Sequence, residues 1–266
     1  MARSCSSQVA MDFERLHPGT PEWTAYIANH EARYAFAAMH VDASVRRVLD
    51  AACGVGYGAR ILAERLQAHV TAVDRDAGAL SVARREFPHP NVEWRQTECP
   101  ELRALDGETF DAVVSLETLE HLDQQPVFLA RCARLLRSGG ALVVSTPNPL
   151  VTGNHEWKYH VHEPRPSELV EMLSDAGLEH VRLFGQTLNA LGLLRREVRA
   201  EIQTLRHNPL ARLGFAVQRV VRGLALGPAL PERAEDFAFV EYPTADACEA
   251  VGADGPFVVL AVGRRP

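Results

Sequence analysis

Short apolar segments alternate with amphipathic segments over most of the chain. The apolar segments are bounded by glycine, proline or aspartate, and many of the intervening segments repeat apolar residues at helical spacing. Predicted strands cover 47–52, 69–73, 92–95, 110–115, 141–145, 181–184 and 257–262. Predicted helices cover 59–67, 77–86, 128–136, which Gly139-Gly140 would close, and 168–176, and a further helical segment begins at 116. The pattern predicts an α/β fold, with a mostly parallel sheet, helices on both faces and an antiparallel edge formed by the last two strands.

The same pattern divides the chain into four parts of one structural domain. Residues 1–46 comprise a tail, expected to be disordered at its start, and one or two helices over 22–40 that form an N-terminal cap. Residues 47–186 form the core. Residues 187–254 combine a basic amphipathic stretch with a loop rich in proline and acidic residues, so we expect a helical insertion or lid there. Residues 255–266 return to the core as its last strand.

Composition narrows the class of protein. The chain has 266 residues, of which 47% are hydrophobic and 23% charged, as is usual for a globular protein. No apolar run approaches the length of a membrane span, and the N-terminus lacks the apolar centre of a signal peptide, so we expect a cytoplasmic protein. A net charge of −6 counts against a nucleic acid as partner. The cysteines form no C-x-x-C pair and are expected to be reduced thiols: Cys5, Cys53, Cys99, Cys132 and Cys248.

A glycine-rich loop lies between the first predicted strand and the following helix. Residues 50–58 read D-A-A-C-G-V-G-Y-G. Glycines let the backbone turn tightly and approach a ligand, and the helix N-terminus behind them favours an anion. Asp74, at the end of the next strand, can accept hydrogen bonds from two ribose hydroxyls. With Ala59 the loop also satisfies the looser dinucleotide pattern G-x-G-x-x-A, so its glycines alone leave a NAD-dependent dehydrogenase open.

This loop resembles that of the class I S-adenosylmethionine-dependent methyltransferases, and the resemblance covers about 47–186 and the last strand. It implies a Rossmann-like sheet and S-adenosylmethionine as cofactor. Asp50 would lie near the methionine part of the donor, Glu98 would accept from the adenine amino group, and Cys99 would offer its backbone amide to the ring. Thr97-Glu98 stands where the family usually has Gly-Asp. The expected donor-site residues are Arg33, Asp50, Cys53, Gly54, Gly56, Gly58, Asp74, Glu98, Cys99 and Ser115.

An acidic cluster with a histidine follows the fourth predicted strand. Glu117, Glu120 and His121 are spaced i, i+3 and i+4, so on a helix they would share one face. Taken singly, each has an ordinary structural explanation. Together, two carboxylates and an imidazole are costly to crowd at the carboxyl edge of the sheet unless a cation joins them. Oxygen ligands with imidazole suit Mg²⁺ or Mn²⁺, so the trio indicates a divalent metal site.

A histidine-rich segment follows the fifth predicted strand. Residues 155–163 read H-E-W-K-Y-H-V-H-E and come after T-P-N at 146–148. The set E-x-x-E-H, T-P-N and H-x-x-E resembles metal-dependent methyltransferases, among them the small-RNA 3′-end 2′-O-methyltransferases, and bacterial sugar and glycan enzymes carry a similar set. It implies His160 as the fourth ligand, with His162 as the alternative, and aligns Glu163 with the family's glutamate. The expected metal ligands are Glu117, Glu120, His121 and His160.

The predicted N-terminal helix carries a further resemblance to the glycan enzymes. Residues 29–34 read N-H-E-A-R-Y, where His30, Arg33 or Tyr34 would close over the carboxylate of the donor. An ordinary helix with His30 and Arg33 in solvent is the alternative interpretation.

These features predict a metal-assisted O-methyltransferase that acts on a hydroxyl of a sugar, glycan or glycosylated metabolite. Metal coordination would lower the pKa of that hydroxyl, and His121 or His160 would take its proton. The expected partner is a small-molecule or oligosaccharide acceptor, and a homodimer is one option for the assembly. Four alternatives stay open: a quinone, phenol or other natural-product O-methyltransferase, an RNA 3′-end enzyme, a dehydrogenase, and a non-catalytic binding module.

Overall fold

The computed structural model describes residues 16–153, 159–189, 192 and 233–266. The start of the tail, where disorder was expected, and the basic stretch of the predicted insertion lie outside these described residues. No helix in the described ranges is long and apolar enough to cross a membrane.

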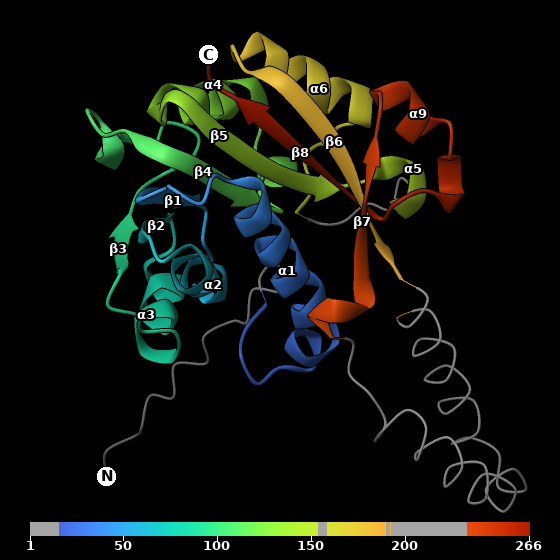
Figure 1. Ribbon diagram of the computed structural model, residues 1–266. Coiled ribbons are helices and arrows are strands. Elements are labelled where there is room, and N and C mark those ends of the chain that lie inside the picture. Colours follow the sequence, from blue (N-terminus) through green and yellow to red (C-terminus); the bar gives the residue numbers. More distant parts are fainter. Residues whose placement is uncertain (1–15, 154–158, 190–191, 193–232) are drawn as a thin grey trace, which may run out of the picture.

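Eight strands form one sheet in the order β3-β2-β1-β4-β5-β8-β6-β7 (Figure 1). Neighbours from β3 to β5 are parallel, whereas β8 runs antiparallel to both β5 and β6, and β7 runs antiparallel to β6. This arrangement confirms the predicted Rossmann-like fold with its antiparallel edge. The strands are β1 (Arg47–Ala51), β2 (His69–Asp74), β3 (Val92–Gln96), β4 (Phe110–Leu116), β5 (Leu136–Pro147), β6 (Glu179–Leu188), β7 (Phe237–Tyr242) and β8 (Val258–Arg264).

Helices cover both faces of the sheet because successive strand residues point to opposite sides. In β1, Val48 packs into the core on one face and Leu49 into the core on the other, and both are fully buried. The first core lies under α1, α2 and α3, and the second lies under α4 and α6 (Figure 1). These helices are α1 (Pro21–His40), α2 (Tyr57–Leu66), α3 (Ala77–Glu86), α4 (Gln125–Leu135) and α6 (Pro166–Asp175).

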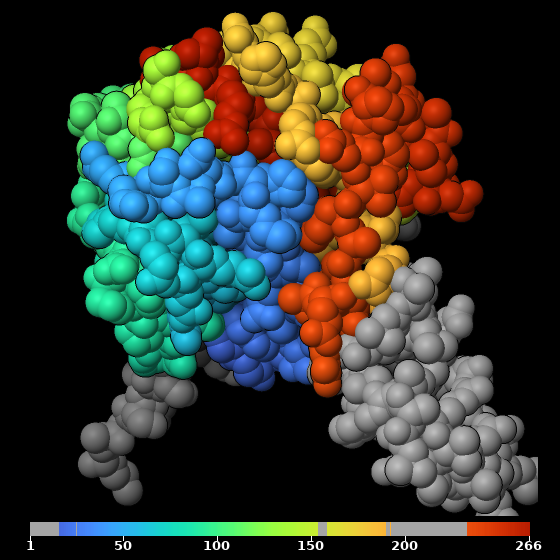
Figure 2. Space-filling model, viewed as in Figure 1, coloured from blue at the N-terminus to red at the C-terminus, as the bar shows by residue number. Residues whose placement is uncertain are grey.

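The N-terminal segment forms a single long helix, α1. It begins where the Thr20 side chain accepts a hydrogen bond from the backbone N–H of Trp23 at 3.1 Å, with Pro21 in the first turn, a position at which its missing N–H costs nothing. In the space-filling view α1 (blue) lies between α2 (cyan) and β7 (orange) (Figure 2). This helix therefore connects the parallel part of the sheet with its antiparallel edge.

Short elements complete the described chain. They are η1 (Arg103–Leu105), η2 (Leu119–His121), α5 (Pro149–Thr152), η3 (Ala234–Asp236), α9 (Ala245–Glu249) and η4 (Gly252–Asp254).

Three local predictions were wrong. The helix expected from 116 is absent, because β4 continues to Leu116, Glu117 has a left-handed φ of 52°, and only the 3₁₀ turn η2 follows. Gly139-Gly140 does not close a helix: α4 ends at Leu135, and both glycines lie within β5, where Gly139 takes a φ of 74°. The predicted insertion contains β7, which pairs with β6 over its whole length and is part of the sheet.

Candidate functional site

The glycine-rich loop turns tightly between β1 and α2. Gly54 and Gly56 have positive φ values of 54° and 91°. A Cβ on Gly56 would lie 2.5 Å from the Trp94 ring, and one on Gly58 would lie 1.9 Å from the Tyr34 ring, whereas one on Gly54 would meet nothing within 4 Å. Two of the three glycines are thus required by close packing, and the third borders open space.

Asp74 closes this loop from the end of β2. Its Oδ2 accepts a hydrogen bond from the Gly54 N–H and its Oδ1 one from the Asp76 N–H, both at 2.9 Å. Each carboxylate oxygen has a second lone pair, so the side chain can hold the loop and still accept from a ligand.

Asp50 lies behind the loop in β1 and is fully buried. Its Oδ1 accepts from the Tyr34 hydroxyl at 3.3 Å, and its Oδ2 has no hydrogen-bond partner among the described residues. Burial raises the pKa of Asp50 to about 8, against a smaller lowering by the Tyr34 hydrogen bond. Asp50 therefore helps to hold the Tyr34 side chain through this hydrogen bond.

Of the other residues expected at the donor site, some line the cavity and some do not. Cys53 and Cys99 line the same cavity as Gly54 and Asp74, whereas the Glu98 residue is exposed and does not line it. The Ser115 hydroxyl donates to the carbonyl of Ala51 at 2.9 Å, so it joins β4 to β1 inside the sheet.

Arg33 was also expected at the donor site, but it is only 1% exposed and its guanidinium contacts other side chains of the protein. Its guanidinium donates to Asn29 Oδ1 and, at 2.7 Å, to Gln186 Oε1, and it lies 3.6 Å from the Glu117 carboxylate. Glu117 Oε1 in turn accepts from the Ser145 hydroxyl at 2.8 Å. This network connects α1, β6 and the residues after β4.

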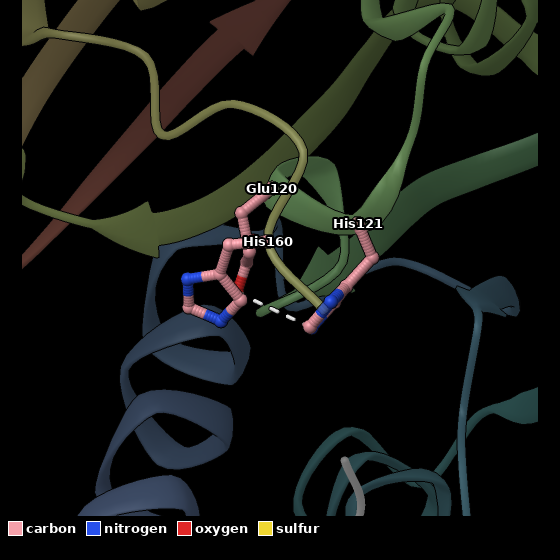
Figure 3. Close-up of side chains that lie close together, drawn as sticks. All are labelled: Glu120, His121 and His160. Carbon is pink, nitrogen blue, oxygen red and sulfur yellow. Dashed lines mark ion pairs between the residues drawn. The ribbon is translucent and has the colours of Figure 1, made fainter. Parts of the chain in front are cut away.

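Three of the four expected metal ligands converge (Figure 3). Candidate ligand atoms of Glu120, His121 and His160 all lie within 4.8 Å of one another. Glu120 and His121 come from η2, and His160 comes from the loop after α5, whose backbone N–H at Val161 donates to the Glu120 carbonyl at 2.7 Å. Glu117 is outside this group, since its carboxylate contacts Ser145 and Arg33.

Glu120 is the buried member of the cluster, at 1% exposed. Its Oε2 has no hydrogen-bond partner among the described residues, and its Oε1 lies 3.8 Å from His121 Nε2. Burial, and then the neighbouring Glu117, raise the pKa of Glu120 well above its usual value. A cation would satisfy this carboxylate and remove the cost of its burial, so the donor set of one carboxylate and two imidazoles fits a divalent metal.

The two described histidines of the loop after α5 have different environments. His160 lies with its ring 4.9 Å from that of His121, centroid to centroid, and belongs to the cluster. His162 is 55% exposed and faces Glu168 at 3.3 Å, outside the cluster. The structure thus places His160, and not the alternative His162, where a ligand could be.

One cavity of about 730 Å³ connects the two groups of residues. Gly54 and Asp74 line one part of it, and Glu120, His121 and His160 line another. A ligand bound by the glycine loop would therefore share a single space with a second ligand at the cluster.

Sequence reasoning missed a polar pair in the wall of this cavity. The Tyr57 hydroxyl lies 3.0 Å from Nδ1 of His30, and both residues line the cavity. Burial, and then the nearby Arg33, lower the pKa of His30 well below its usual value, so the ring is neutral. The position of Tyr57 between two loop glycines was the signal that could have identified it.

The known proteins that this chain resembles are methyltransferases, the class of enzyme that the sequence predicted. Residues 49–144 match the family described as a methyltransferase domain. A probable S-adenosylmethionine-dependent methyltransferase of Mycobacterium tuberculosis is 34% identical over 84% of this chain and 78% of its own length. A ubiquinone biosynthesis O-methyltransferase of Hahella chejuensis is 34% identical over 55% of this chain and 68% of its own length.

A solved structure from Thermotoga maritima has a similar fold. It is described as an S-adenosylmethionine-dependent methyltransferase and possible histamine N-methyltransferase, and it superposes with a TM-score of 0.58 at 15% identity over 92% of this chain and 94% of that one. The glycine loop after β1, the sheet order and the 34% identity to a relative that is covered over 78% of its length all indicate the same family. The chain belongs to the class I S-adenosylmethionine-dependent methyltransferases.

Proposed function

We propose that the protein is a divalent-metal-assisted O-methyltransferase whose acceptor carries two adjacent hydroxyls, as sugars, glycans and glycosylated metabolites do. The observation that carries this proposal is that Glu120, His121 and His160 converge in the cavity that the glycine loop also lines. Cofactor and acceptor must share one space for in-line transfer, and the cluster lies within it.

Two groups of residues in the cavity would have separate roles, one in binding the cofactor and the other in binding the metal. Gly54 and Asp74 would hold the cofactor, whose sulfonium supplies the electrophilic methyl group. Glu120, His121 and His160 would hold Mg²⁺ or Mn²⁺, which supplies the Lewis acidity that makes a hydroxyl easier to deprotonate.

Either His121 or His160 is also a candidate to receive the proton of the acceptor hydroxyl, but only where its Nε2 does not hold the metal, because one lone pair cannot do both. His121 Nδ1 lies 3.0 Å from the Tyr159 carbonyl, which can only accept, so this ring is a neutral imidazole with its lone pair on Nε2 or an imidazolium. In the neutral form Nε2 is the proton acceptor, and it is the atom that faces Glu120.

Aromatic residues support a sugar acceptor. Tyr26, His30, Tyr34 and Tyr57 line the cavity and offer ring faces and polar edges, which suit the mixed apolar and hydroxyl surface of a sugar. The part of 187–254 outside β7 is our candidate for shaping the acceptor end of the cavity, since loops usually carry specificity.

A quinone or phenol acceptor is the second candidate. Leu122, Pro147 and Phe257 give part of the cavity an apolar lining, which suits a planar ring, and relatives include ubiquinone biosynthesis O-methyltransferases. A catechol also presents two adjacent hydroxyls, so the metal cluster is compatible with it.

Turnover of labelled S-adenosylmethionine tests the acceptor class. A panel should pair sugars that carry a vicinal diol with the same sugars blocked at one hydroxyl, and should include catechols. We expect methylation of a free diol in the sugar series and loss of it on blocking. Methylation of catechols alone would favour the second candidate, and methylation of isolated hydroxyls would remove the need for chelation.

Variants of the cluster test the metal. His160→Ala should reduce both turnover and stoichiometric Mn²⁺ binding, whereas the matched variant His162→Ala, in the same segment but outside the cluster, should change neither. Glu120→Gln removes an anionic ligand at nearly constant volume and should act like His160→Ala. The reverse order of the two histidine variants would transfer the ligand role to His162.

A further inference from the structure

His160 is held by a carboxylate as well as by its place in the loop. Its Nδ1 lies 2.6 Å from Oε1 of Glu163, and the two side chains are 19% and 10% exposed, so solvent only partly screens the contact. The other oxygen of Glu163, Oε2, lies 2.8 Å from the Thr152 hydroxyl, which is also 3.0 Å from the Asn148 carbonyl. Glu163 is thus tied to α5, the short helix that follows β5, as well as to His160 in its own loop.

This contact determines which ring nitrogen carries the lone pair. An ionised carboxylate can only accept, so the hydrogen bond requires a proton on Nδ1 of His160, and in the neutral ring the lone pair is on Nε2. In His121, too, Nδ1 carries the proton, because it lies 3.0 Å from the Tyr159 backbone carbonyl, which can only accept. Both imidazoles of the cluster are therefore oriented through Nδ1, one by backbone and one by a side chain.

A nearby histidine–glutamate pair, His162 and Glu168, lacks this arrangement. His162 faces Glu168 through Nε2 at 3.3 Å, and both side chains are about half exposed, at 55% and 46%. Exposed pairs of this kind contribute little because water and salt screen them. The His160–Glu163 contact differs in ring nitrogen, distance and burial.

We propose that Glu163 is a positioning residue that holds His160 with Nδ1 protonated, so that Nε2 serves the cluster formed with Glu120 and His121. The proposal rests on the proposed function only for the use made of Nε2, as metal ligand or proton acceptor. The tautomer itself depends on contacts within the chain. A carboxylate behind a ligating histidine typically raises metal affinity by about 10- to 100-fold.

The test uses the full chain labelled with ¹⁵N-histidine, in Glu163→Met and Glu163→Gln variants, with His162→Ala as the matched control. Methionine keeps the length of the side chain without an acceptor, and glutamine keeps a neutral acceptor. Two-bond ¹H–¹⁵N spectra without metal report the tautomer of each ring, and His160→Ala assigns its signals. Calorimetric titration with Mn²⁺ alone reports metal affinity, and circular dichroism reports folding.

We expect His160 in the wild type to show a protonated Nδ1, Glu163→Met to lose this signature with about 10- to 100-fold weaker Mn²⁺ binding, and Glu163→Gln to be intermediate. His162→Ala should match the wild type. An unchanged His160 tautomer in folded Glu163→Met would overturn the proposal. If the wild type binds no Mn²⁺ but Glu163→Met still loses the signature, the positioning role stands and the proposed metal function fails.

Discussion

The Arg33 guanidinium lies 3.6 Å from the Glu117 carboxylate, with Arg33 only 1% exposed. The contact brings α1 against the residues that follow β4, which form one wall of the cavity. Arg33 is a cation close to a group of acids that includes the buried Glu120. The positive charge of Arg33 offsets the repulsion between Glu117 and Glu120 in this poorly solvated region.

Removing this cation should destabilise the fold. Arg33→Met leaves Glu117 without its ion pair and Gln186 Oε1 without the donor 2.7 Å away. Breaking a buried pair from one side typically costs about 3–5 kcal/mol, and because the Glu117 side chain is 18% exposed we expect the lower end. Urea unfolding measures the change. The double variant Arg33→Met/Glu117→Gln should be less destabilised than the sum of the single variants, and strict additivity would contradict a direct pair.

Asp74 should contribute to cofactor affinity in two separable ways. Asp74→Ala removes both the proposed acceptor for a ribose hydroxyl and the contact that holds Gly54, so S-adenosylhomocysteine should bind about 1–3 kcal/mol more weakly. Asp74→Asn keeps one acceptor oxygen and should lose less. Calorimetry on folded variants is the measurement, and equal affinity for Asp74→Ala and wild type would remove the ribose assignment.

The loop glycines should differ in their tolerance of alanine. Gly58→Ala would place Cβ 1.9 Å from the Tyr34 ring, and that ring is held by Asp50, so we expect loss of stability and of S-adenosylhomocysteine binding. Gly54→Ala is the control for the stability of the ligand-free fold, because its Cβ meets nothing there and only the left-handed φ is costly, at about 1–2 kcal/mol. Thermal unfolding without ligand compares the two variants, and equal losses of stability would show that close packing is not the cause.

Asp50 should make the ligand-free protein less stable as pH rises. Its pKa is about 8 in the folded chain against an ordinary value of 3.8, so between these pH values the folded state holds a proton that the unfolded state has released. Stability should therefore fall with pH from about 4 to 8, by at most about 1.4 kcal/mol per pH unit for this group, and level off above. Urea unfolding of wild type and Asp50→Asn at pH 5 and pH 8 isolates this contribution. A stability difference between the two proteins that does not change with pH would show that Asp50 is ionised in the fold.

The parallel part of the fold was predictable because its signals are local. β1, β2 and β4 are largely buried runs next to a turn signal, β3 is a partly exposed run that follows Pro90, and the glycine loop follows β1 directly. β7 was missed because Phe237–Tyr242 is an edge strand with partly exposed residues, whose strand partner in the described sheet, β6, lies about 50 residues earlier in the chain.

The site was predictable in its residues more than in its geometry. The spacing of Glu117, Glu120 and His121 indicated a common face, but the left-handed backbone at Glu117 turns its carboxylate towards Arg33 and Ser145. His160 joins Glu120 through a contact between segments some 40 residues apart, which no local pattern reports. The burial of Arg33 depends on Gln186, 153 residues away, and could not be read from the helix that carries it.

Turnover under exhaustive chelation, with cofactor binding measured on the same sample, tests the central claim most directly. The glycine loop and the Glu120–His121–His160 cluster line one cavity but use different residues, so a metal at the cluster should be needed for transfer and not for cofactor binding. We predict that chelation abolishes methyl transfer, that S-adenosylhomocysteine affinity is unchanged, and that Mg²⁺ or Mn²⁺ restores transfer. Full activity after exhaustive chelation would contradict the account and leave the cluster a structural or acid–base role.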